Sequence, residues 1–543
     1  MSRAYASTTS TATITTAAAA AASSTPTLEI DAILDAAPYV PVISSLSSVY
    51  SASALPAQER RWASLVESFK NLYPAEDLTF IARSPGRVNL IGEHIDYSLF
   101  DVLPMAITQD VLIAVHVGGT DGKLVLNNTD PHFVSRTFNV ADLKDLEIDA
   151  TVHEWSNYFL AGVKGLFSLL PSAEIPSMHC LIDGRIPTGA GLSSSSAFVC
   201  ASLLAIATAV KAASPYSTTF ANAVTKSDLV QSAIVSERHV GVNSGGMDQS
   251  ASVFGVPGHA LRVQFYPQLK ASPVAFQSDD FAFVIANTLV VADKHVTGPI
   301  HYNLRVVETT VAAEILAKQC GLGPLPIRDG FGGTLRGVVE AFKARGVDMT
   351  GVMDKVKQVF SKQEGYTLAE TAELLGQTEL EITQKYMTRF PVRFERFQFR
   401  ARALHVLDEA RRVERFCELL THAPADQCGE DAEEKYLQDL ASIMTASHKS
   451  CRALFDCSCE ELDELVGLAV ANGAYGSRLT GAGWGGATVS LVRKDKADEF
   501  VQCLKEEYYS KRYPGISQDK MNDAICITEP GLGSAVVVGS YSG

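Results

Sequence analysis

The sequence has few basic residues relative to acidic ones. Its 543 residues include 61 Asp and Glu against 46 Lys and Arg, which gives a formal net charge of −15. General binding to nucleic acid or to an anionic membrane needs a basic excess, so we expect neither partner. With 46% apolar and 20% charged residues, the composition is typical of a folded globular protein.

The chain also lacks the patterns of zinc modules, membrane spans and secretion signals. Its ten cysteines show no paired CxxC spacing, which disfavours a zinc site or a disulfide framework. No run approaches the ~18–20 apolar residues of a membrane span, and the nearest, Ala197 to Val210, predicts a buried helix. Because the N-terminus has no compact apolar segment, we expect a cytoplasmic location.

The N-terminal segment is low in complexity. From Ser2 to Thr27 almost every residue is Ser, Thr or Ala, and Arg3 carries the only charge. A mitochondrial transit peptide would need several arginines, so a largely disordered extension over residues 1–56 is the favoured interpretation. Order is expected from about residue 57, in a helix that runs toward Leu72 with Trp62, Leu65, Phe69 and Leu72 at helical spacing.

Short strand-like segments and long helical patterns follow. The strand-like segments are 78–82, 111–117, 281–285 and 487–492, and the helical patterns are 302–318, 392–414 and 434–455. Their irregular interleaving predicts an α+β protein. No internal repeat is present.

A glycine and serine cluster at 184–196, GRIPTGAGLSSSS, leads directly into the apolar helix. Gly189 and Gly191 would let backbone N–H groups approach an anion, and the helix N-terminus adds unpaired donors and a positive dipole end. Serine hydroxyls could add donors or a magnesium ligand. The cluster therefore predicts a phosphate cradle, although a polar linker that caps a core helix has the same composition.

Other nucleotide motifs match less well. The P-loop pattern GxxxxGK[ST] fails at Gly122-Lys123. The pattern GxGxxG fits Gly481 to Gly486, but there it leads into a strand instead of a helix. We expect a turn that lies close to a ligand or to the loop at 184–196, with a tight structural turn as the alternative.

Two charged clusters complete the set. Residues 83–97, RSPGRVNLIGEHIDY, interleave ionisable and apolar side chains, which favours a buried polar pocket suited to sugar hydroxyls over a structural ion-pair network. Residues 237–249, ERHVGVNSGGMDQ, place acids near a glycine-rich turn. By themselves these acids are better explained as ordinary turn residues than as a base or a metal ligand.

Taken together, these motifs resemble the three signatures of the GHMP small-molecule kinases. The quoted residues are GRVNLIGEHIDY, GLSSSSA and GSRLTGAGWGGATVSLV, and the first is similar to galactokinases and N-acetylgalactosamine kinases. VGVNSGGMDQ and YNLRVVE extend the resemblance over roughly residue 78 to the end. It implies a two-domain fold, with an N-terminal domain like domain 2 of ribosomal protein S5 over 57–280 and a ferredoxin-like C-terminal domain over 281–543.

The resemblance also implies ATP-dependent phosphorylation of α-D-galactose at O1, with direct in-line transfer. Asp248 takes the place of the base and Arg87 that of the charge stabiliser. The other implied contacts are Glu93, His94, Asp96, Gly245 and Tyr302 for sugar; Gly189, Gly191, Ser193, Ser194, Trp155 and Lys294 for ATP; and Ser195 with Glu237 for Mg²⁺. For Trp155 a core position is the alternative.

The alternatives are an N-acetylgalactosamine kinase and a galactose- and ATP-dependent co-inducer that binds a transcriptional repressor. Ser196 replaces an alanine of the usual galactokinase motif, but the length of the loop is preserved. Because a non-catalytic galactose sensor of yeasts lacks two residues in this loop, the preserved length favours an active kinase.

Overall fold

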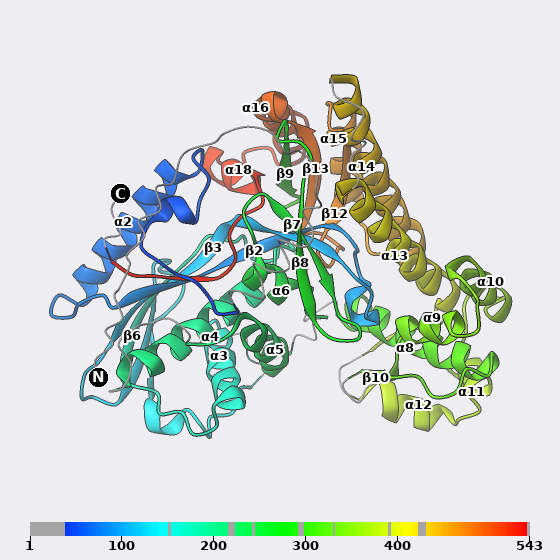
Figure 1. Ribbon diagram of the computed structural model, residues 1–543, viewed down its shortest axis with the longest axis horizontal. Helices are drawn as coiled ribbons and strands as arrows, with labels where there is room; N and C mark the ends of the chain where they lie inside the picture. Colours follow the sequence, from blue (N-terminus) through cyan, green and yellow to red (C-terminus); the bar gives the residue numbers. More distant parts are fainter. Residues whose placement is uncertain are drawn as a thin grey trace, which may run out of the picture.

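The computed structural model describes residues 38–149, 152, 154–214, 223–241, 245–290, 298–328, 332–388, 392–421 and 430–539. In this part of the chain two main sheets carry helices on their faces (Figure 1). The predicted α+β class is confirmed. Lys294 lies outside the described residues.

The larger sheet has seven strands in the order β1-β15-β2-β3-β6-β4-β5. These are β1 (Val42–Ile43), β15 (Ala535–Val537), β2 (Phe80–Ile91), β3 (Leu103–Val117), β6 (Met178–Gly184), β4 (Lys123–Asn128) and β5 (Arg136–Asn139). The antiparallel pair β2 and β3 forms its long centre, and the register shifts twice, between Pro85 and Arg87 and between Asn89 and Ile91. Such irregularities bend a strand and change the direction of its side chains.

Helices cover both faces of this sheet. On one face α2 (Leu55–Leu72) buries Trp62, Leu65 and Phe69, as the helical spacing predicted, whereas the last residue of the same pattern, Leu72, is 45% exposed at the end of the helix. The other face carries α3 (Ser156–Leu169), α4 (Ser194–Ala213), α5 (Lys226–Ser236) and α6 (Met247–Phe254), and Figure 1 shows α3 and α4 opposite α2.

The apolar helix α4 lies in the middle of this domain. It packs against α3, β2 and β3. Among the described residues it is the one helix with the length and composition to cross a membrane, and 72% of its most apolar window is buried inside the protein. The prediction of a buried helix is confirmed.

The smaller sheet has four antiparallel strands in the order β12-β13-β9-β14. They are β9 (Phe281–Asn287), β12 (Gly476–Thr480), β13 (Ala487–Arg493) and β14 (Ile525–Thr528), with helices α14 (Glu430–Ser450), α15 (Glu460–Ala471) and α16 (Ala497–Leu504) between them in sequence. Numbered in chain order, the strands lie 2-3-1-4, which is the ferredoxin-like arrangement that the resemblance implied.

A helical region joins β9 to α14. It contains α8 (Tyr302–Gln319), α9 (Leu335–Lys343), α10 (Met349–Val359), α11 (Leu368–Leu375), α12 (Glu379–Tyr386) and α13 (Phe399–Thr421), together with the short pair β10 (Ile327–Arg328) and β11 (Gly332–Gly333). The remaining elements are β7 (His259–Gln264), β8 (Lys270–Ala275), α17 (Ser510–Arg512) and α18 (Gln518–Ala524). α13 begins later than residue 392, where the helical pattern began.

The structure differs from the expected boundaries at both ends of the chain. Order begins before residue 57, because β1 pairs with β15 and the side chains of Leu46, Val49 and Tyr50 are buried beside α2. The Tyr50 hydroxyl donates to Asp110 at 2.7 Å. Near the C-terminus, β15 pairs with β2 and so belongs to the sheet of the first domain instead of the second.

Candidate active site

The two side chains expected to act in catalysis are in contact. Arg87 lies in β2 and Asp248 in the first turn of α6. Nε and Nη2 of Arg87 each lie 2.8 Å from Oδ1 of Asp248. Nη1 of the same guanidinium donates to the carbonyl oxygen of Gly191 at 2.6 Å. One buried arginine therefore joins the expected base to the expected phosphate loop.

The phosphate loop connects β6 to α4. Gly189 and Gly191 have φ values of 72° and 71°, which only glycine adopts without strain. Ser193 precedes the first helical residue, Ser194, and the Ser193 hydroxyl is buried without a hydrogen-bond partner. With the first N–H groups of α4, this hydroxyl forms a set of donors suited to a phosphate group.

The third glycine motif lies against this loop. A Cβ atom built on Gly481 would lie 2.3 Å from the Gly191 carbonyl oxygen, and one on Gly486 would lie 3.1 Å from the Ala190 carbonyl oxygen. The expectation of a turn beside the loop at 184–196 is confirmed. Because this turn joins β12 to β13, the smaller sheet helps to fix the phosphate loop of the larger domain.

His94 lies in an aromatic cage next to this turn. Its Nε2 lies 2.9 Å from the Ala482 carbonyl oxygen and its Nδ1 lies 3.2 Å from the Tyr97 hydroxyl. A carbonyl oxygen only accepts, so Nε2 carries the proton and Nδ1 accepts from the tyrosine. Burial lowers the pKa of His94 to about 3, so the ring is neutral. The Tyr302 ring, at the start of α8, lies 5.7 Å away.

Asp96 and Gly245 are neighbours. Asp96 is buried, its Oδ1 accepts the Tyr97 backbone N–H at 2.9 Å, and its carboxylate fills the space that a Cβ of Gly245 would need. A side chain at position 245 would displace the carboxylate. The first motif and the segment before α6 thus meet as expected.

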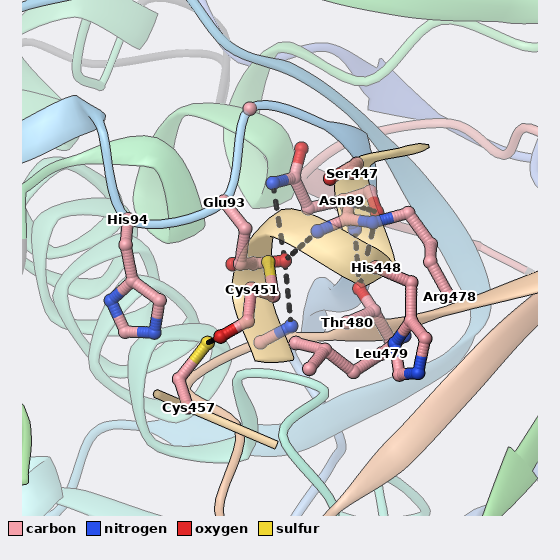
Figure 2. Close-up of polar contacts among 12 residues, drawn as sticks. Asn89, Glu93, His94, Ser447, His448, Cys451, Cys457, Arg478, Leu479 and Thr480 are labelled. Atoms are coloured by element: carbon pink, nitrogen blue, oxygen red, sulfur yellow. Dashed lines mark hydrogen bonds and ion pairs between the residues drawn. The ribbon is translucent and has the colours of Figure 1, made fainter. Parts of the chain in front are cut away.

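Glu93 makes contacts that the sequence did not predict. Its Oε2 accepts from Arg478 Nη2 at 3.1 Å, from the Gly481 N–H at 3.1 Å and from Asn89 Nδ2 at 3.3 Å (Figure 2). Burial raises the pKa of Glu93 to about 7, although Arg478 and Arg87 act in the opposite direction. The side chain is fixed by protein donors on the smaller sheet and on β2.

The serine that contacts Glu237 is Ser196, one position after the expected Ser195. The Ser196 hydroxyl donates to Glu237 Oε2 at 2.8 Å, and the same oxygen accepts from Gln249. Glu237 is fully buried. A buried carboxylate next to a run of hydroxyls offers the hard oxygen ligands that Mg²⁺ prefers, so the residues fit this ion.

Trp155 is half-buried and packs against the edge of the core. Its indole N–H donates to the Val134 carbonyl oxygen at 3.0 Å. The indole stacks at 6.3 Å and an interplanar angle of 7° on Phe198, which lies near the start of α4. An aromatic surface is therefore available near the phosphate loop.

Comparisons with known proteins identify the family of this chain. The galactokinase galactose-binding signature matches residues 67–117, the GHMP kinase N-terminal domain 157–256 and the GHMP kinase C-terminal domain 430–510. The galactokinase of Candida albicans is 40% identical over 504 residues, which are 89% of this chain and 96% of the relative. That of Saccharomyces cerevisiae is 39% identical over 522 residues, 90% of this chain and 96% of the relative. The chain belongs to the galactokinase family.

A solved structure supports the fold. The Lactococcus lactis galactokinase in complex with galactose superposes with a TM-score of 0.62 at 22% identity, covering 87% of this chain and 99% of that one. The two-domain GHMP kinase fold is thus confirmed.

The galactokinase-family motifs did not identify every residue around the site. Arg478 lies inside the third motif, where a lone charge in an otherwise uncharged segment was an available signal. His405 and Glu409 lie in the charge-rich helix α13, where the sequence pattern gives no sign that they are buried. Two other rings lie beside His94: Phe455, which belongs to none of the quoted motifs, and Trp484, which lies inside the third motif.

Proposed function

We propose that this chain transfers the γ-phosphoryl group of ATP to the O1 hydroxyl of α-D-galactose. Membership of the galactokinase family supports the reaction class. The observation that carries the proposal is the Arg87 guanidinium, which contacts the Asp248 carboxylate and the Gly191 carbonyl of the phosphate loop together. A sugar hydroxyl beside Asp248 would face a phosphate held by that loop.

In this reaction O1 attacks the γ-phosphorus while the bond to the β,γ-bridging oxygen breaks. ADP leaves, and the O1 proton passes to the Asp248 carboxylate. Arg87 offsets the negative charge that spreads over the transferred group, and no covalent enzyme intermediate forms. The buried position of the pair, with side chains 5% and 15% exposed, limits competition from water.

The remaining roles follow from position. Asp96, His94, Glu93, Gly245 and Tyr302 would surround the sugar. Gly189, Gly191, Ser193 and Ser194 would hold the phosphates at the start of α4, with Trp155 beside the adenine.

Glu237 and a serine of the loop, Ser195 in the family pattern, would hold Mg²⁺. When bound, the ion would neutralise charge on the β- and γ-phosphates. Lys294 stays a predicted phosphate contact.

A coupled assay of ADP release tests the proposal. Purified protein with Mg-ATP is expected to turn over galactose, with N-acetylgalactosamine and glucose as comparison sugars. Asp248→Asn should lower kcat by about 10²–10⁴-fold. Asp228→Asn, in the first turn of α5, is a matched control expected to retain activity. Turnover of N-acetylgalactosamine alone would change the substrate, and full activity of Asp248→Asn would disprove the role of the base.

A further inference from the structure

The backbone of the sugar loop, residues 92–96, is held by a buried carboxylate from a distant helix. Glu409 of α13 is fully buried. Its Oε1 accepts the backbone N–H of Gly92 at 2.9 Å and that of Glu93 at 3.2 Å, together with the Ser447 hydroxyl at 2.7 Å. Its Oε2 accepts from Arg412 Nε at 2.7 Å. A helix more than 300 residues away in sequence therefore supplies the hydrogen-bond acceptor for two backbone N–H groups of the loop.

The loop needs such an acceptor because it leaves the sheet at this point. β2 ends at Ile91, and φ is +107° at Gly92 and +62° at His94. The N–H groups of residues 92 and 93 then lack a neighbouring strand, and an unpaired buried N–H costs about 1–3 kcal/mol. The charged Oε1 of Glu409 accepts both N–H groups, and hydrogen bonds to a charged acceptor are stronger than those between neutral groups.

A second residue of α13 holds the same loop through the carbonyl oxygen of Glu93. His405, one helical turn before Glu409, donates from Nε2 to the Glu93 carbonyl oxygen at 3.0 Å, while its Nδ1 lies 2.8 Å from the Ser450 hydroxyl. Its ring lies 4.4 Å from Phe455, which in turn lies 4.8 Å from the His94 ring. Both backbone polar groups of Glu93 are thus fixed by α13, and its side chain by Arg478 (Figure 2).

The charge balance keeps Glu409 ionised. Burial alone would raise its pKa, but the guanidinium groups of Arg412 and Arg478 lower it to about 2. Burial lowers the pKa of His405 to about 4, so this ring is neutral at physiological pH. A carboxylate that stays charged while its neighbour stays neutral can accept the loop N–H groups throughout the working range of an enzyme.

We propose that Glu409, assisted by His405, is a positioning residue that fixes the galactose-binding loop and thereby sets affinity for the sugar. It acts through the backbone that presents Glu93, His94 and Asp96. This inference rests on the proposed function, because the sugar is the ligand that the loop is assigned. Its signature is a change in sugar binding with little change for ATP.

The test is Glu409→Gln, which keeps the shape but removes the charge. We expect KM for galactose to rise about 10–100-fold, as loss of charge-assisted hydrogen bonds would give, with KM for ATP within about twofold. Glu418→Gln is the matched control: Glu418 lies on the same helix, is 58% exposed and pairs with Arg415 at 3.0 Å. It should leave both constants unchanged.

A second variant covers the case in which Glu409→Gln does not fold. Ser447→Ala removes one donor to Glu409 and leaves the charge, so a smaller rise in KM for galactose alone is expected. Unchanged galactose KM in either folded variant, or parallel loss of ATP and sugar affinity, would overturn the inference. Calorimetry of the wild type with galactose separates the two claims: no binding overturns the proposed function as well, whereas normal binding with a normal Glu409→Gln overturns only the positioning role.

Discussion

Replacement of Gly481 by alanine tests how tightly the third glycine motif holds the phosphate loop. Gly481 has φ +85°, and its added Cβ would lie 2.3 Å from the Gly191 carbonyl oxygen. An ordinary contact is 3.4 Å or longer, so the two groups must separate by 3.4 − 2.3 = 1.1 Å. This carbonyl accepts from Arg87, which also holds Asp248.

Two costs are expected in Gly481→Ala. The left-handed backbone costs about 1–2 kcal/mol for a residue with a Cβ, and the overlap adds about 1–3 kcal/mol. Because a misplacement of about 1 Å can lower a rate about 10²-fold, kcat for galactose should fall by about that factor. Urea unfolding followed by tryptophan fluorescence measures the loss of stability, and ADP release at saturating substrates measures the fall in kcat.

Gly515→Ala separates backbone strain from overlap. Gly515 has nearly the same φ, +87°, but no atom lies within 4 Å of an added Cβ. Gly515→Ala should therefore lose only the stability that the left-handed backbone costs, about 1–2 kcal/mol, and keep its kcat. If both variants lost the same stability and Gly481→Ala kept its kcat, the contact between the two glycine loops would not control the position of Arg87.

Three further predictions concern charge and nucleotide binding. His94 and His405 have folded pKa values of about 3 and 4 against an ordinary 6.5, so the unfolded chain takes up protons first as pH falls. The stability that the two neutral histidines contribute above pH 6.5 is therefore lost as the pH falls below that value. The free energy of unfolding should fall by about 2 kcal/mol per histidine between pH 7 and 5. Equal urea midpoints at the two pH values would contradict this. Trp155→Leu should raise KM for ATP severalfold and leave KM for galactose, and the opposite pattern would place the indole at the sugar. Glu237→Gln should raise the Mg²⁺ concentration for half-maximal activity about tenfold; an unchanged titration would exclude Glu237 as a ligand.

Periodicity and motif chemistry predicted local elements well because each depends on neighbouring residues. The spacing of Trp62, Leu65 and Phe69 is enough to define α2, and the apolar run of α4 is enough to define a core helix. The resemblance brought Arg87 and Asp248 together before any geometry was known, although 161 positions separate them.

Glu409 and the Tyr50 segment show where sequence patterns stop being informative. A glutamate in a charge-rich helix has the same pattern whether it faces solvent or a buried loop, and only the position of Gly92 and Glu93 distinguishes the two. Residues 38–56 fall within the N-terminal extension that is predicted to be largely disordered from the low-complexity Ser, Thr and Ala segment at 2–27. Their order depends on pairing with β15, almost 500 positions later in the chain.

This pairing has a consequence for synthesis on the ribosome. β15 lies between β1 and β2, so until residues 535–537 emerge, β2 carries an unpaired edge and Nη1 of Arg83 lacks its two acceptors, the carbonyl oxygens of Leu532 and Gly533. Exposed edges invite association with other chains. The first domain to be translated is therefore the last to be completed, and premature stop codons very near the 3′ end should be as damaging to its solubility as truncations within the second domain.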